Sequence, residues 1–170
     1  MIDEKPLLDA RTVALSAVFA TGVAIATILI AFPIGIGYLN FGEIVIFTAA
    51  FLFGGLVGGL AGGIGAAAAD MILGFAFWAP VTLVVKGLEG LVVGRLSGKG
   101  VKSKLVGVAA GAPIMIIGYT LVTAYLEGMP AALFREFPMA VVQAVVGAAI
   151  GIPLAEILQK RIPQLKDDQG

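Results

Sequence analysis

Long apolar runs alternate with short polar, glycine-rich or proline-containing breaks along almost the whole chain. A helix needs about 20 mostly apolar residues to cross a bilayer, and the runs predict an all-α bundle of six transmembrane helices. Their approximate ranges are 10–31, 43–53, 56–73, 80–96, 105–126 and 131–161. The second and third could instead be one tilted helix, but about 35 apolar residues exceed one span. We therefore predict one membrane domain over residues 1–170, with a break at Gly54 and Gly55.

The connections carry the residues that end helices. Pro33 and the glycines near it predict a loop over residues 32–41 with Pro and Gly at turn positions, and residues 97–104 form a polar, basic hinge. Pro80 suits the first turn of the fourth helix, and Pro113 predicts a kink in the fifth. The chain opens with M-I-D-E-K-P, which is acidic rather than basic, so we expect the first helix to be retained and not cleaved as a secretory signal.

Small residues recur at helical spacing in the first and third helices. The third contains two GxxxG rows: Gly54, Gly58 and Gly62, and Gly55, Gly59 and Gly63. The first contains Ala10, Ala14, Ala17 and Thr21, with a second row of Ala20 and Ala24. Such rows let two helix backbones approach closely in lipid. The glycine rows predict close helix packing, whereas the first helix could use its small residues within this chain or to dock another protein.

Composition agrees with a membrane protein and excludes several kinds of chemistry. The chain is 59% hydrophobic and only 13% charged, with a mean hydropathy of +1.05, whereas soluble domains are about 25% charged. It has neither His nor Cys, which removes disulfides, thiolate chemistry and the usual zinc sites. The formal net charge is zero, so nothing predicts a nucleic-acid partner. Residues 94–100 have the wrong spacing for a phosphate-binding loop, so the chain is not expected to be an ATPase.

The basic residues divide unequally when successive connections alternate across a membrane. One side receives Lys5, Arg11, Arg95, Lys99, Lys102, Lys104, Lys160, Arg161 and Lys166. The other receives only Arg135, while Lys86 lies within a span. The positive-inside rule then places both termini in the cytoplasm, which requires an even number of spans. Residues 33–42, 74–79 and 127–132 are predicted to lie outside.

Several ionisable groups interrupt the apolar segments. A charge at the centre of a bilayer costs about 2.5–3.5 kcal/mol on insertion scales, so such a group tends to face protein or water. Lys86 and Glu89 are three residues apart and could form an internal ion pair or contact a ligand. Glu43 could interact with the N-terminal dipole of its helix, and Asp70 could lie at the interface or face a ligand.

Aromatic and amide groups gather near the predicted outer side. Tyr38 and Trp78 could stack on a flat ligand, or turn the chain and join the aromatic belt. Gln143 could bind a ligand or hold helices together. The complete candidate ligand-binding set is Tyr38, Asn40, Glu43, Asp70, Trp78, Lys86, Glu89, Tyr119, Glu136 and Gln143. No nucleophile with an adjacent base and no metal-binding spacing is visible, so the set indicates a pocket without a metal or cofactor rather than an active site.

Three segments carry a resemblance to a known family. They are G-Y-L-N-F-G-E at residues 37–43, the glycine-rich segment that ends in Ala69-Asp70, and A-P-V-T-L-V-V-K-G-L-E-G-L at residues 79–91. Arg135-Glu136-Phe137-Pro138 with Gln143 adds an E-x-P…Q pattern. Together they resemble the S components, or substrate-capture subunits, of energy-coupling factor (ECF) vitamin transporters. The similarity is greatest to members assigned to hydroxymethylpyrimidine or pyridoxine.

This resemblance implies a multi-pass subunit of the bacterial cytoplasmic membrane that captures a small water-soluble vitamin or precursor from outside. It implies partnership with a membrane coupling protein and two cytoplasmic ATPases, with Ala10, Ala14, Ala17 and Thr21 as the docking row. One alternative is a self-sufficient small transporter or channel, although the chain shows no repeated half of the kind many transporters carry. A third is an intramembrane enzyme that acts on lipid, which the lack of His and Cys disfavours.

Overall fold

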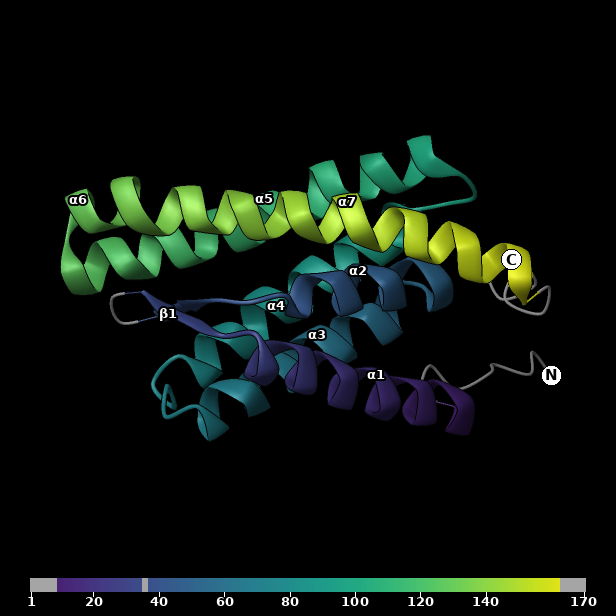
Figure 1. Cartoon of the computed structure of the whole chain (residues 1–170), viewed down its shortest axis with the longest axis horizontal. Helices are drawn as coiled ribbons and strands as arrows, with labels where there is room; N and C mark the ends of the chain where they lie inside the picture. Colours follow the sequence, from purple (N-terminus) through teal and green to yellow (C-terminus); the bar gives the residue numbers. More distant parts are fainter. Residues whose placement is uncertain (1–8, 35–36, 163–170) are drawn as a thin grey trace, which may run out of the picture.

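Six helices of at least 12 residues account for most of the computed structural model, which describes residues 9–34 and 37–162. The elements in chain order are α1 (Ala10–Leu29), β1 (Phe32–Ile34), β2 (Gly37–Leu39), α2 (Gly42–Phe53), α3 (Gly55–Ile72), α4 (Ala79–Leu96), α5 (Val101–Glu127), α6 (Met129–Ala131), the π-helical turn η1 (Ala132–Glu136) and α7 (Phe137–Arg161). The β-hairpin and α6 lie at one end of the bundle, whereas α1 begins and α7 ends at the other (Figure 1). The predicted polar ends, with Lys5 and Lys166, lie outside the described residues.

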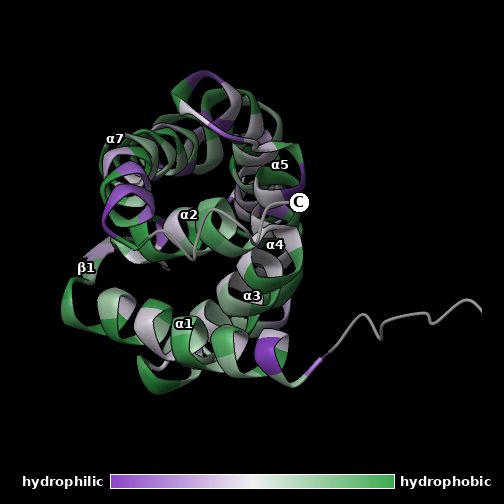
Figure 2. Ribbon diagram, turned by 90° about the vertical axis from the view of Figure 1, so that its right-hand side faces the viewer, coloured by the Kyte–Doolittle hydropathy of each residue, from purple (hydrophilic) through white to green (hydrophobic). Residues whose placement is uncertain are grey.

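Four segments are long and apolar enough to cross a membrane: α1, α3, α5 and the continuous stretch Met129–Arg161. Of the other two helices, α2 has only 12 residues and α4 carries Lys86, Glu89 and Arg95. Figure 2 shows α2 in the middle of the bundle, with α1, α3, α4, α5 and α7 around it. The chain is therefore a predominantly helical membrane bundle in which α2, the shortest of the six long helices, is the most enclosed.

Several local predictions differ from the structure. The segment at 32–41 is more regular than the predicted loop, because Phe32 pairs with Leu39 and Pro33 with Tyr38 in an antiparallel hairpin. This pairing satisfies backbone groups that a loop next to lipid would leave without partners. The helix before it ends at Leu29 rather than near residue 31. The last helical segment begins at Met129 and contains a π-helical turn that the hydropathy pattern does not reveal.

The fifth helix begins at Val101, so Lys104 belongs to it and not to a hinge. The Lys104 side chain is fully buried, with its Nζ 2.5 Å from Glu156 Oε1 and 3.2 Å from Gln159 Oε1. Gln159 in turn donates from Nε2 to the backbone oxygen of Phe51, 3.3 Å away, in the last turn of α2. This polar cluster ties α5 and α7 to α2 at the end of the bundle away from the hairpin.

The glycine rows confirm the predicted close packing. A Cβ added to Gly59 would lie 2.8 Å from the backbone oxygen of Gly87, and one added to Gly63 would lie 2.7 Å from that of Leu83. Gly54, which separates α2 from α3, has a φ of +84°, a value that favours glycine. Backbone contact therefore joins α3 to α4, whereas α5 and α7 are partly separated by an open apolar groove of about 640 Å³.

A candidate ligand pocket beneath the hairpin

Polar and aromatic groups from six elements and two loops line a cavity of about 50 Å³. The lining residues are Tyr38, Asn40, Ala66, Asp70, Trp78, Thr82, Lys86, Tyr119, Glu136 and Gln143. A void needs about 10–15 Å³ to admit one water, so this one has room for only a few. Eight of the ten residues that the sequence nominates meet here. The other two, Glu43 and Glu89, are not among the lining residues and instead contact Lys86.

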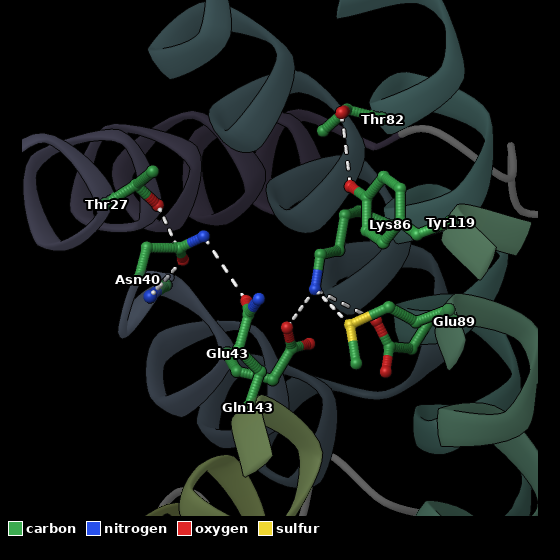
Figure 3. A network of polar contacts seen from close by, with 10 residues as sticks. Thr27, Asn40, Glu43, Thr82, Lys86, Glu89, Tyr119 and Gln143 are labelled. Atoms are coloured by element: carbon green, nitrogen blue, oxygen red, sulfur yellow. Dashed lines mark hydrogen bonds and ion pairs between the residues drawn. The ribbon is translucent and has the colours of Figure 1, made fainter. Parts of the chain in front are cut away.

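Lys86 forms the base of the pocket, and Figure 3 shows its ammonium pointing toward two carboxylates. It makes an ion pair with Glu43 of α2, and its Nζ lies 3.5 Å from Glu89 Oε2 one turn along α4. It also donates to the sulfur of Met115 and lies 5.7 Å from the centre of the Tyr119 ring. The predicted Lys86–Glu89 pair therefore exists, but Glu43 is the closer partner. All three charged side chains are at most 4% exposed.

Glu43 reaches this position because α7 approaches α2 very closely. A Cβ added to Gly147 of α7 would lie 2.7 Å from Glu43 Cγ, so only glycine leaves room there for the glutamate. Glu43 Oε1 and both oxygens of Glu89 are buried and make no hydrogen bond within the described residues. One ammonium thus serves two carboxyl groups in a water-poor environment, where a charge without a partner is costly.

Asn40 joins the hairpin to three helices. Its Oδ1 accepts from the backbone N–H of Gly42 at 2.9 Å and from the hydroxyl of Thr27 at 3.4 Å. Its Nδ2 donates to Gln143 Oε1 at 3.3 Å, across 103 residues of chain. Both amides therefore have structural partners and also line the pocket (Figure 3).

Tyr38 and Asp70 form the side of the pocket nearest the hairpin. The Tyr38 hydroxyl donates to Asp70 Oδ1 at 2.5 Å, and its ring packs against Phe75 with centroids 5.0 Å apart. Burial and then the hydrogen bond to Asp70 raise the pKa of Tyr38 above its ordinary value, which keeps the phenol a donor. Asp70 is only 3% exposed, so it does not occupy a simple interfacial position.

Trp78 and Tyr119 form the aromatic side. Trp78 is 7% exposed, and its ring meets that of Tyr119 edge-on with centroids 5.8 Å apart. The indole therefore lies inside the protein and not in an exposed aromatic belt. The Tyr119 hydroxyl donates to Thr82 Oγ1 at 3.1 Å. Sequence reasoning missed Thr82, although it lies four residues before Lys86 on the same helical face. It also missed Ala66, which bears the same relation to Asp70.

Glu136 reaches the pocket from the π-helical turn, a feature that is frequent at functional sites. Its neighbour Arg135 points elsewhere and forms an ion pair with Glu127. Among residues 9–34 and 37–162, no group of three or more His, Cys, Asp or Glu side chains is arranged to hold a metal ion.

The two small-residue rows of α1 differ in environment. Ala10, Ala14, Ala17 and Thr21 are all exposed. Ala20 is buried, and its backbone packs against Gly65 of α3. The second row is therefore used within the chain, whereas the first is not covered by any described residue.

Comparison with known proteins adds two findings. A family model described as the S component of the ECF-type riboflavin transporter matches residues 8–160. A protein of Pyrococcus woesei, described as an uncharacterized protein in the gap 3′ region, is 48% identical over 145 residues, which cover 82% of this chain and 96% of that protein. Neither finding distinguishes the hydroxymethylpyrimidine or pyridoxine subgroup that the sequence motifs favour.

Proposed function

Because the chain belongs to the family of S components of ECF-type riboflavin transporters, we propose that it captures a small vitamin or vitamin precursor in the pocket beneath the hairpin. Members of this family are substrate-binding subunits of membrane transporters and not enzymes. The finer proposal concerns the substrate, its site and the partner proteins of this particular chain.

The observation that carries the proposal is the convergence of the lining residues. Side chains separated by up to 105 positions, from Tyr38 to Gln143, meet at one cavity. Ligand sites are typically apolar hollows with a few placed polar groups, and this cavity combines three aromatic side chains with amides, carboxyls, a hydroxyl and an ammonium group. A group of charges that only stabilised the fold would not require Trp78 and Tyr119 to stand beside it.

The cavity favours a small flat ligand. Trp78 and Tyr119 offer aromatic surface for stacking on a heteroaromatic ring. In a cavity of only about 50 Å³, a single ring such as hydroxymethylpyrimidine or pyridoxine needs less displacement of side chains than the three-ring system of riboflavin. We therefore propose a one-ring substrate, with riboflavin as the competing possibility that the family description supplies.

A direct test uses the purified protein. Mass spectrometry of co-purified small molecules identifies the ligand, and isothermal titration with hydroxymethylpyrimidine, pyridoxine and riboflavin ranks the candidates. We expect Trp78→Ala to weaken binding at least tenfold. Tyr125→Ala, which removes an aromatic ring that is 88% exposed on α5, should bind as the unmodified protein does. Unchanged affinity in Trp78→Ala would remove the stacking role.

We also propose that the exposed row of α1 docks on a membrane coupling protein that works with two cytoplasmic ATPases. The exposure of Ala17 and the burial of Ala20 support this choice of face. The chain has no native cysteine, so Ala17→Cys should form a disulfide or reagent cross-link with a cysteine in the coupling protein, while Ala20→Cys should not. Substrate uptake by liposomes that hold this chain alone would instead indicate a self-sufficient transporter.

The proposed location is the bacterial cytoplasmic membrane, with both termini on the cytoplasmic side. Arg95, Lys99 and Lys102 lie at or beside the turn between α4 and α5, at the end of the bundle where α1 begins. An excess of basic residues at that end supports the orientation. The hairpin and the pocket would then face outward, as capture from outside requires.

A further inference from the structure

Acidic groups outnumber basic ones around the pocket. Asp70 and Glu136 line it, and Glu43 and Glu89 contact the Lys86 ammonium. Against these four carboxyl groups the lining offers a single cation, because Arg135 is turned away and paired with Glu127. The cavity is thus rich in hydrogen-bond acceptors and poor in positive charge.

The one cation is already occupied. An ammonium group has three donor hydrogens, and that of Lys86 contacts Glu43, the Met115 sulfur and Glu89. Two hydroxyl donors are committed as well. The Tyr38 hydroxyl goes to Asp70, and the Tyr119 hydroxyl goes to Thr82. An anion that entered would have to break an existing contact to find a positive partner.

One acceptor in the lining, by contrast, is available to a ligand. Asp70 Oδ1 accepts from Tyr38, but Asp70 Oδ2 is buried and makes no hydrogen bond within the described part of the chain. A buried acceptor left without a partner costs about 1–3 kcal/mol, and such atoms in native proteins call for an explanation. Since Asp70 lines the cavity, a donor on the ligand would supply the missing bond.

We propose that the pocket selects a ligand that carries hydrogen-bond donors, such as an amino group, a protonated ring nitrogen or a hydroxyl, and that it excludes the phosphate ester of the same compound. This inference rests on the proposed function and specifies its substrate class. A phosphate group brings a charge of about −1.5 to −2, which does not match a lining with two carboxyl groups and one cation that is already paired. Asp70 is the acceptor for the ligand's donor, and Glu136 adds to the repulsion.

The test compares matched pairs by isothermal titration: pyridoxamine with its 5′-phosphate, hydroxymethylpyrimidine with its phosphate, and riboflavin with its 5′-phosphate. We expect the unphosphorylated member of the pair that binds to have at least a hundredfold higher affinity. Because the ester is also larger, charge must be separated from size. Asp70→Asn removes the charge at nearly constant volume, so it should weaken the unphosphorylated compound and lower the discrimination at least tenfold.

Two further variants complete the test. Glu127→Gln removes a carboxylate outside the pocket and should leave the discrimination unchanged. Glu136→Gln is a second charge removal within the lining, in case Asp70→Asn does not fold. Esters that bind as well as their parent compounds, or discrimination that persists in every folded pocket variant, would overturn this inference and leave the proposed function standing. If no probe binds and no small molecule co-purifies, the proposed function itself fails.

Discussion

Replacing Lys86 by Met should strongly destabilise the protein, and restoring charge balance should rescue it. Met has a similar length but no charge, so Lys86→Met leaves Glu43 and Glu89 buried with no cation between them. Both carboxyl side chains are at most 1% exposed, and three of their four oxygens already lack a hydrogen bond among the described residues. The loss of Lys86 therefore leaves no described group that offsets their charge.

The expected magnitude follows from this burial. Removing one partner of a buried ion pair costs about 3–5 kcal/mol, whereas replacing the whole group by neutral residues of similar volume is often neutral or better. For a chain of this size each kcal/mol corresponds to about 2–4 °C, so Lys86→Met should melt roughly 6–20 °C lower. The triple variant Lys86→Met, Glu43→Gln, Glu89→Gln should recover most of that loss.

The assay is a thermal melt in detergent followed by the fluorescence of Trp78, the only tryptophan. Arg135→Met provides the control, because the Arg135–Glu127 pair is about one-quarter exposed on both sides and exposed pairs contribute about 0–1 kcal/mol. A melting temperature for Lys86→Met within 2 °C of the control, or a triple variant that is no more stable than the single one, would refute the reasoning.

Two other pairs of variants test the packing. Gly90→Ala should lower the free energy of unfolding by about 1–3 kcal/mol, since its Cβ would lie 2.6 Å from the backbone carbon of Gly58. Gly87→Ala on the same helix should be tolerated, because its Cβ would be 3.7 Å from the nearest atom. Equal melting temperatures for the two variants would contradict the backbone contact. Glu156→Leu should lower the free energy of unfolding by about 3 kcal/mol, because it leaves the fully buried Lys104 without a carboxylate partner. Lys104→Met should lower it less, because Glu156 is 24% exposed and can reach water. Urea unfolding of both variants checks that order.

Hydropathy and spacing were sufficient to predict the long helices and to nominate most of the residues that line the cavity. A polar residue inside an apolar run avoids lipid and faces protein or water. For this reason the sequence alone predicts that Asp70, Lys86 and Gln143 lie in one cavity. The GxxxG rows likewise predicted backbone contact, because close approach in lipid has few other sequence signatures.

Contacts between distant segments were harder to predict. Local spacing favours Glu89 as the partner of Lys86, yet the closer carboxylate is Glu43, 43 residues away on a helix that only the tertiary fold brings near. Lys104 was misassigned because a basic residue between two apolar runs resembles a cytoplasmic loop, and its partner Glu156 is 52 positions away. The hairpin strands have three residues each, too few for an alternating pattern to stand out.

The contact between the α3 and α4 backbones determines which parts of the pocket are able to yield. Where two helix backbones are in direct contact, few flexible side chains lie between them to be compressed. Asp70 of α3 and Lys86 of α4 therefore belong to the more rigid side of the cavity. Tyr119, Glu136 and Gln143 stand on the opposite wall, where α5 and α7 are partly held apart by a groove. A ligand larger than the cavity should therefore meet less resistance on the side of α5 and α7 than on the side of α3 and α4.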